Sequence, residues 1–460
     1  MAHHFHPSLL REYDMRGVVG RTLGEEDAYA VGRSFGTLVR RAGGSRVAVG
    51  YDGRLSSLPL EAALVHGLTD SGVDVVRIGV GPTPMLYYAE AVLDVDGGVQ
   101  ITGSHNPADH NGFKLVHQHD PFFGADIVQL SALAAAGDWT QGAGQVESAS
   151  IMDRYADRLV QGFDGAAWRI GWDAGNGAAG PVVEKLVKLL PGEHHTLFTE
   201  IDGHFPHHHP DPTIEANLED LRALVLSRKL DFGLAFDGDG DRIGVVDGKG
   251  RIIWGDQLIG LFAEDVLKKA PGATIVADVK ASQALFDRVA ALGGKPLMWK
   301  TGHSLIKSKM KQVGSPLGGE MTGHIVFADD YYGFDDGLYA AVRLIRAATG
   351  LGRSVTALRD AMPELRNTPE LRFSVEEERK FALVSELVER LRSAGADVDE
   401  TDGARVTTGD GWWLLRASNT QSELVARAEA RDQPGLDRLL AELHAQLRDS
   451  GVIRAAGPGK

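Results

Sequence analysis

The sequence predicts an α/β protein of four domains, and three recurring units of strand and helix carry this prediction. Each unit begins with a short run of β-forming residues that ends in or near an aspartate, at residues 47–52, 169–173 and 275–280. A polar or glycine-rich turn and a helical pattern follow each run. Strand signals that alternate with helix signals favour α/β units around a largely parallel sheet.

Helical patterns follow these strands. Residues 60–68 and 281–292 carry apolar side chains at mixed spacings of three and four, which is typical of amphipathic helices. Pro59 stands just before the first pattern, where proline is common at a helix start. The units are too dissimilar to prove an internal duplication, and any α/β protein shows such runs. Repeated domains and an ordinary α/β fold therefore both stay open at this point.

Three breaks in composition divide the chain. Residues 135–148 are rich in glycine, alanine and glutamine, residues 247–251 form a turn between apolar runs, and two prolines flank a polar link at 362–370. Beyond the last break, charged helical segments surround a short apolar strand at 412–415. We therefore expect four domains of roughly 100 to 150 residues, an ordinary size. The expected ranges are 1–149, 150–249, 250–363 and 364–460.

The composition excludes several classes of function. The net charge of −15 argues against non-specific binding to nucleic acid, which needs a basic surface, although local basic clusters can still bind small anions. The absence of cysteine excludes disulfides, thiol catalysis and thiolate metal sites. Residues 1–10 lack the apolar core of a signal peptide, and no apolar run approaches the length of a membrane helix. We expect a cytoplasmic protein with no membrane segment.

A tight loop at residues 102–107 presents the hydroxyl of Ser104. Gly103 permits backbone conformations that other residues resist, and Pro107 prevents a helix from continuing. Alone, this hydroxyl fits a turn-stabilising residue, a hydrolase nucleophile or a phosphate carrier. The hydrolase is disfavoured because the G-x-S-x-G elbow is missing and because His105, as a sequence neighbour, is badly placed to act as its base.

An acidic loop at residues 237–242 predicts a metal site. Asp237, Asp239 and Asp241 alternate with glycine between two apolar strand patterns, so their carboxylates can converge and offer the oxygen ligands that suit Mg²⁺ or Ca²⁺. An EF-hand is excluded, because Arg242 and Gly248 stand where that motif needs glycine and glutamate. A solvated acidic turn is the alternative, but three aspartates between apolar strands would repel one another without a cation.

The metal site changes the interpretation of the serine loop. Magnesium neutralises charge on a transferring phosphoryl group, so Ser104 is predicted to carry a phosphate that completes the ligands of the metal. Lys114 follows an Asn-Gly turn signal, which favours a place near that loop. There it would steady a phosphate or exchange a proton, and an ordinary surface lysine is the alternative.

Two further segments carry groups suited to a sugar phosphate. Glu320, Thr322 and His324 alternate, so on an extended segment they would share one face and match vicinal hydroxyls, although a polar loop is equally consistent. Residues 416–420 follow the strand at 412–415 and offer arginine, serine, asparagine and threonine, a set that cradles phosphate. A capped helix start is the alternative for that segment.

Together these motifs resemble the α-D-phosphohexomutase family, most closely its bacterial phosphomannomutase/phosphoglucomutase group, over nearly the whole chain. Residues 102–107 resemble the phosphoserine loop of the family, and residues 237–242 resemble its metal loop. Residues 319–324 resemble the sugar-binding loop and residues 416–420 the phosphate-binding loop. Further matches are found at 11–17, 81–84 and 300–303.

The resemblance implies three related mixed α/β sheet domains and a smaller C-terminal α+β domain that can rotate, all around a central active-site cleft. It implies Mg²⁺ bound by Ser104, Asp237, Asp239 and Asp241. It implies catalytic roles for phosphorylated Ser104, for Lys114 and Arg16 near the transferring group, and for His303 in proton transfer. The substrate-binding positions that it implies are Tyr13, Arg242, Lys280, Glu320, Thr322, His324, Arg416, Ser418, Asn419, Thr420 and Arg427.

The implied activity is reversible phosphoryl transfer between C1 and C6 of glucose and mannose phosphates. It would pass through phosphoserine and a hexose 1,6-bisphosphate, with glucose 1,6-bisphosphate as activator and intermediate. The expected partners are small hexose phosphates, and a monomer is expected, with a dimer left open. Thr322 stands where the group commonly has serine, which keeps the hydroxyl but adds a methyl group.

Two alternatives stay open. One is a mutase for glucosamine phosphates, although Met321 favours the glucose and mannose type. The other is a non-catalytic sensor of sugar phosphates, which would predict a broken serine loop or metal loop. Neither loop is broken in this sequence.

Overall fold

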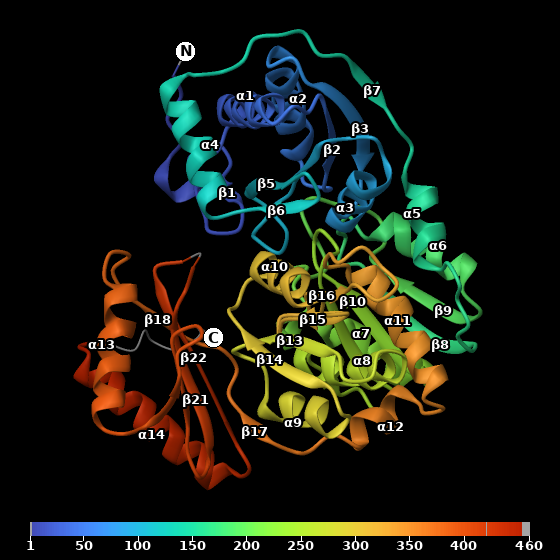
Figure 1. Cartoon of the computed structure of the whole chain (residues 1–460). Helices are drawn as coiled ribbons and strands as arrows, with labels where there is room; N and C mark the ends of the chain where they lie inside the picture. Colours follow the sequence, from blue (N-terminus) through green and yellow to red (C-terminus); the bar gives the residue numbers. More distant parts are fainter. Residues whose placement is uncertain (1, 420, 453–460) are drawn as a thin grey trace.

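Four separate β-sheets organise the molecule (Figure 1). The computed structural model describes residues 2–419 and 421–452. Within these ranges, no helix combines the length and the apolar content that a membrane crossing requires. Figure 1 shows the fourth sheet with its two helices set apart from the other three domains.

The first sheet has the strand order β1-β5-β4-β2-β3-β7, with β6 paired to β5. Its strands are β1 (Met15–Val18), β2 (Arg46–Tyr51), β3 (Asp74–Val80), β4 (Gly97–Ile101), β5 (His110–His117), β6 (Asp120–Phe122) and β7 (Val146–Ser148). The helices of this domain are η1 (Pro7–Leu9), α1 (Glu25–Arg41), α2 (Ser57–Asp70), α3 (Thr83–Val92) and α4 (Ala125–Ala136). The helix expected at 60–68 is α2, so Pro59 lies inside its first turn rather than before it, where the missing N–H costs no helical hydrogen bond.

The second sheet has the order β12-β11-β10-β8-β9, and the third has the order β14-β13-β15-β16. The second domain contains β8 (Trp168–Asp173), β9 (Gly192–Leu197), β10 (Phe232–Phe236), β11 (Ile243–Asp247) and β12 (Ile252–Ile253), with α5 (Met152–Leu159), α6 (Gly180–Leu189), η2 (Glu215–Leu218) and α7 (Glu219–Arg228). The third contains β13 (Thr274–Asp278), β14 (Lys295–Trp299), β15 (Leu317–Gly319) and β16 (Ile325–Phe327), with α8 (Gly255–Lys269), α9 (Gln283–Ala291), α10 (His303–Val313), α11 (Gly337–Gly350) and α12 (Val355–Asp360).

The first three sheets share one pairing pattern. The three strands found in the sequence are β2, β8 and β13, and each lies parallel to two neighbours. On one side, the neighbour of each central strand pairs with an antiparallel strand, giving β4–β5, β10–β11 and β15–β16. Because the three sheets pair their strands in the same way, the three domains share one topology, as expected for related domains. The expected fold class of three mixed α/β domains and a smaller α+β domain is confirmed.

The fourth sheet is antiparallel throughout, with the order β17-β22-β21-β20-β19 and β18 paired to β22. Its strands are β17 (Arg366–Asn367), β18 (Leu371–Ser374), β19 (Asp397–Asp399), β20 (Ala404–Thr407), β21 (Gly411–Ala417) and β22 (Glu423–Ala430). Helices α13 (Lys380–Ser393) and α14 (Gln433–Asp449) pack against β21 and bury leucines such as Leu387 and Leu443 in a core of their own.

The cores show which domains are fused. One continuous apolar cluster joins part of the first domain to the second and third, and α11 contributes to it by packing against β10, β11 and β16. The fourth domain keeps its own core and meets the third through a small apolar contact of Val279 with Trp412 and Leu414. We keep the ranges 1–149, 150–249, 250–363 and 364–460 as proposed boundaries, because each contains the strands of one sheet, except that β12 of the second sheet lies just beyond residue 249.

Candidate active site

A cleft of about 630 Å³ is lined by residues from all four domains. Most of the side chains singled out in the sequence line it. They are Tyr13, Arg16, Lys114, Arg242, Lys280, His303, Glu320, Thr322, His324, Arg416, Ser418 and Asn419. Thr420 lies outside the described residues. Five basic groups from all four domains thus face one cavity together with a carboxylate and two histidines, a set suited to an anionic, hydroxyl-rich ligand.

The repeated topology explains why the loops meet. The serine loop joins β4 to β5, the acidic loop joins β10 to β11, and the sugar loop joins β15 to β16. These are the three equivalent hairpins of the three related sheets. The fourth loop also follows a hairpin, between β21 and β22. One structural position, used in each of the three related domains, therefore supplies three of the four groups of functional residues, and a hairpin of a different sheet supplies the fourth.

Ser104 is buried, and its backbone adopts a left-handed conformation with a φ of 49°. This conformation costs on the order of 1 kcal/mol for a residue with a side chain, so neighbouring contacts must hold it. Arg54 donates to the carbonyl of Ser104 over 2.7 Å, and Asp52 accepts from the backbone N–H of Gly103 over 3.1 Å. The hydroxyl of Ser104 donates to Asp237 over 3.0 Å. The serine is thus fixed against the acidic loop.

The three aspartates of the acidic loop are fully buried. Lys114 donates to Asp239 over 2.7 Å and also contacts Asp241, while Thr83 donates to Asp239 over 2.5 Å. Burial together with the charges of Asp241 and Asp239 raises the pKa of Asp237 well above its ordinary value. Burial would also raise the pKa of Asp239, but Lys114 lowers it below its ordinary value. Lys114 and Arg242, which lies 3.9 Å from Asp237, bring two positive charges to three carboxylates, so the cluster keeps an excess of negative charge.

The donor set of the acidic loop fits a magnesium ion. One oxygen from each of the three aspartates lies within 4.8 Å of the others. One carboxylate oxygen of Asp239 and one of Asp241 are buried without a hydrogen-bond partner among the described residues. Buried acceptors without partners are costly, and hard oxygen donors are the ligands that Mg²⁺ prefers.

The sugar loop differs from the expectation of an extended segment. Residues 320–324 form a turn between the antiparallel strands β15 and β16, and Gly323 has a φ of 93° within it. The extended expectation was wrong because the chain must reverse direction within these residues. Glu320 accepts from the backbone N–H of Gly302 over 2.8 Å and from Thr322 over 3.0 Å. The three side chains Glu320, Thr322 and His324 thus line the cleft from a turn and not from an extended segment.

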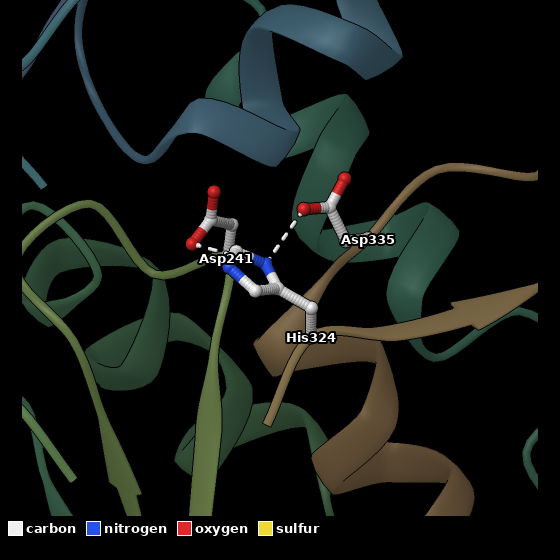
Figure 2. A group of neighbouring side chains, drawn as sticks. All are labelled: Asp241, His324 and Asp335. Carbon is white, nitrogen blue, oxygen red and sulfur yellow. Dashed lines mark hydrogen bonds and ion pairs between the residues drawn. The ribbon is translucent and has the colours of Figure 1, made fainter. Parts of the chain in front are cut away.

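Two histidines stack in the cleft. The ring centroids of His303 and His324 are 4.9 Å apart, at an angle of 16°. His324 Nδ1 lies 2.8 Å from a carboxylate oxygen of Asp335 and 3.7 Å from Asp241, and Figure 2 shows the ring joined to both carboxylates. Nδ1 of His303 lies 3.3 Å from Asp335 without forming a hydrogen bond. Burial lowers the pKa of His303 well below its ordinary value, so this ring is neutral.

The phosphate loop extends from the fourth domain toward the first. Arg416 is buried and donates through Nε to Asp402 over 2.8 Å, while its Nη2 has no hydrogen-bond partner among the described residues. Asn419 contacts the hydroxyl of Tyr13, which itself donates to the carbonyl of Thr301 over 2.6 Å. A buried guanidinium with a free donor and an adjacent amide form the start of an anion site.

Two basic residues of the implied set take different positions. Lys280 lines the cleft and donates to Glu370 over 2.8 Å, which joins the third and fourth domains. Arg427 does not line the cleft. It contacts the carbonyl of Lys280 and lines a second cavity of about 730 Å³ between the same two domains. On β22 it lies two residues beyond Val425, which does line the cleft, and the third domain covers it.

Models of four domain families match the chain in sequence order. They are the phosphoglucomutase/phosphomannomutase alpha/beta/alpha domain I at residues 7–135, domain II at 153–250, domain III at 254–365 and the C-terminal domain at 370–446. The chain belongs to the phosphoglucomutase/phosphomannomutase family. Membership makes the protein a hexose phosphate mutase, which is an isomerase.

Individual relatives of the mutase family match nearly the whole chain. The phosphomannomutase/phosphoglucomutase of Pseudomonas putida is 46% identical over 441 residues, covering 96% of this chain and 95% of that protein. The phosphoglucomutase of Neisseria gonorrhoeae is 42% identical and covers 94% and 95%. The crystal structure of a phosphoglucomutase/phosphomannomutase family protein from Burkholderia thailandensis has a TM-score of 0.92 at 42% identity, covering 97% of this chain and 98% of that one.

Several residues that shape the mutase site were not singled out in the sequence. Asp52 ends one of the recurring strands and Thr83 lies in the matching segment 81–84, so both had a signal. Arg54 and Asp335 had none, because they lie outside the motifs in sequence and contact motif residues only in the folded chain. His209 and Asp211 also line the cleft and come from an irregular segment before β10.

Proposed function

We propose that this mutase moves a phosphoryl group reversibly between C1 and C6 of glucose and mannose phosphates, through phosphorylated Ser104 and a hexose 1,6-bisphosphate. The observation that carries the proposal is that the buried Ser104 and its three aspartates lie directly behind Lys114, which lines the same cleft as Arg416. One end of the cleft can thus transfer a phosphoryl group while the other holds a second phosphate. The site is complete within one chain, which is consistent with a monomer.

In the first step, the phosphoryl group of Ser104 is attacked by the free hydroxyl of a hexose monophosphate. The bond from phosphorus to the serine oxygen breaks, and a bond from phosphorus to the sugar oxygen forms. The sugar hydroxyl loses its proton to a base, and the released serine takes up a proton. After the bisphosphate turns around, the same events in reverse return the other phosphoryl group to Ser104 and release the isomeric monophosphate.

The residues around Ser104 offset the charge of the transferring group. Asp237, Asp239, Asp241 and the Ser104 phosphate would hold Mg²⁺, which when bound neutralises charge on the phosphoryl oxygens. Lys114 lies against Asp239 and Asp241, so its ammonium group would lie close to the phosphoryl group and offset part of its charge. Arg16 lines the cleft and is oriented by Asp14 over 2.7 Å.

Of the two stacked histidines, His324 is the better placed base. Its Nδ1 lies at hydrogen-bond distance from Asp335, and its Nε2 accepts from Arg242 over 2.9 Å. A general base needs a fixed ring with a lone pair within reach of the reacting hydroxyl, so that hydroxyl would take the place of the Arg242 N–H at Nε2. His303 lacks a hydrogen bond to Asp335, so we assign it to shaping the cleft rather than to taking the proton.

The remaining cleft residues hold the sugar in two orientations. Glu320 and Thr322 are linked over 3.0 Å and offer an acceptor and a hydroxyl to neighbouring sugar hydroxyls. The free Nη2 of Arg416 and the amide of Asn419 would bind the phosphate that is not reacting. Because these contacts recognise groups rather than one pose, they serve both halves of the reaction. Hexose phosphates are the proposed partners, and a cytoplasmic location remains a prediction.

The direct test combines an assay with a mass measurement. The protein is incubated with glucose 1-phosphate, Mg²⁺ and a trace of glucose 1,6-bisphosphate, and with mannose 1-phosphate in parallel. Formation of the 6-phosphates supports the proposal, whereas no conversion of either sugar would end it. Intact mass before and after phosphatase treatment should show one removable phosphate that maps to Ser104. Side-by-side kcat/KM values for glucosamine phosphates would reveal the alternative specificity.

A further inference from the structure

Asp335 is a buried carboxylate outside every motif recognised in the sequence. It is fully buried and lies between β16 and α11. Its backbone pairs with Val326, and the next residue, Asp336, caps α11 by accepting from the N–H of Tyr339 over 2.9 Å. The position of Asp335 is therefore fixed on both sides by the backbone of the third domain.

Three side chains converge on this carboxylate. One oxygen accepts from Lys307 over 2.8 Å. The other lies 2.8 Å from Nδ1 of His324 and 3.3 Å from Nδ1 of His303. Asp335 itself does not line the cleft, whereas His324 and His303 do. It contacts the site through other residues.

The partners of His324 determine where its proton lies. Nε of Arg242 lies 2.9 Å from Nε2 of His324, and a guanidinium N–H can only donate. Nε2 must therefore carry a lone pair. The remaining proton of a neutral ring then sits on Nδ1 and points at the carboxylate of Asp335, which is an acceptor.

We infer that Asp335 is a positioning residue, which fixes His324 as the Nδ1–H tautomer and so leaves a lone pair on Nε2, where it accepts from Arg242. The inference rests on the proposed function, in which the reacting hydroxyl takes the place of the Arg242 N–H at Nε2 and gives its proton to that nitrogen. Lys307 stabilises the ionised form of Asp335, because its ammonium group balances the buried negative charge of the carboxylate. A histidine base is commonly oriented in this way by a hydrogen bond to its other nitrogen.

Burial and charge agree with an ionised Asp335. Burial alone would raise its pKa, yet Lys307 and the two histidines lower the pKa well below its ordinary value. An ionised carboxylate accepts hydrogen bonds and cannot donate one, so it selects a single tautomer of the ring.

A metal ion is the competing interpretation of this cluster. Asp241, His324 and Asp335 each offer a ligand atom, and these atoms lie within 4.8 Å of one another (Figure 2). Lys307 already neutralises Asp335, and Arg242 already occupies Nε2 of His324. With these two cations in contact with the cluster, a hydrogen-bonded network accounts for the geometry without an ion.

The experiment compares Asp335→Asn with Asp336→Asn in the full-length enzyme. An amide at 335 can donate toward the ring and so favours the other tautomer, which should lower kcat by about 100-fold to 10,000-fold with less than about a threefold change in KM. Asp336 is its matched control, because it is adjacent and equally buried but accepts from Tyr155, Tyr331 and the cap of α11 instead of the histidine. A merely structural role predicts similar losses in both variants.

Nitrogen-15 NMR of histidine-labelled protein gives the second measurement, with the His324 signals assigned by their absence in His324→Gln. The wild type should show Nδ1–H at His324, and Asp335→Asn should shift the ring toward Nε2–H. A wild-type ring protonated at Nε2, an unchanged kcat in Asp335→Asn, or a bound metal ion that Asp335→Asn alone removes would each overturn the inference. Absence of mutase activity in the wild type would instead refute the proposed function, and the tautomer would still be measured.

Discussion

The two ends of the cleft are built in opposite ways. At the serine end, Ser104 is buried against a cluster of carboxylates, and Arg54 and Asp52 form hydrogen bonds with the backbone of its loop. This end belongs to domains whose apolar cores are fused. The phosphate loop belongs to a domain with its own core, which meets the third domain through a small apolar contact and through polar contacts such as Lys280 with Glu370.

This difference matches the different work of the two ends. Transferring a phosphoryl group benefits from charges that are fixed before the reaction, because then no reorganisation is needed in the transition state. Holding the other phosphate requires a site that opens to admit the ligand and lets the bisphosphate turn, which a separately packed domain permits. Substitutions at the serine end should therefore lower kcat, and substitutions at the phosphate end should raise KM.

The largest effect is expected for Ser104→Ala. Removing the hydroxyl removes the phosphate carrier, so kcat should fall by at least about 10,000-fold, as for other enzymes that lose their nucleophile. Calorimetry with glucose 1,6-bisphosphate should still show binding, because the phosphate loop is intact. Full activity in this variant would contradict the assignment of the serine end.

Metal removal should come next. Dialysis against a chelator should lower kcat by about 100-fold to 1,000-fold, because the charge on the transferring group is no longer balanced. Addition of Mg²⁺ should restore the rate, but not in Asp241→Asn, which loses one buried carboxylate of the cluster. Unchanged turnover in the chelator would show that the aspartates serve Lys114 alone.

At the opposite end, Arg416→Gln should act on binding. The loss of a charged hydrogen bond to phosphate is worth about 1.5 to 3 kcal/mol, so KM for glucose 1-phosphate should rise by about 10-fold to 100-fold, with a smaller change in kcat. Arg438→Gln is a suitable control, since this arginine is exposed on α14 and pairs with Asp410. If Arg416→Gln lowered kcat alone, the contrast between the two ends would be wrong.

The ease of prediction also differs between residues. Ser104, the three aspartates and Glu320 could be found from sequence, because glycine-rich loops with fixed spacing carry them. The turn at 320–324 was missed, since alternating polar residues fit both a strand and a tight reversal. Arg54 and Asp335 could not be found from the sequence, because their roles depend on contacts that form only in the folded chain.

Arg427 shows a further limit of sequence reasoning. It lies on the same strand face as Val425, yet two residues along β22 it contacts the third domain instead of the cleft. Side-chain alternation predicts the face of a strand. It does not predict which neighbouring domain covers that face at each point.

The smallest effect is expected at Glu370, where the fourth domain contacts the third. Burial would raise the pKa of this carboxyl, but Lys280 and Arg372 lower it from 4.5 to about 2. A lowered pKa in the folded state means that the ion pair stabilises the protein above the ordinary carboxyl value and loses this effect as the pH falls toward about 2. Glu370→Gln should therefore lower the urea midpoint at pH 7, with a difference from wild type that narrows below pH 4.5 and closes near pH 2. It should also raise KM by only about threefold, since glutamine keeps a hydrogen-bond acceptor for Lys280 and only the charge of the pair is lost. A constant difference in midpoint at every pH would show that packing, and not charge, joins the fourth domain to the third.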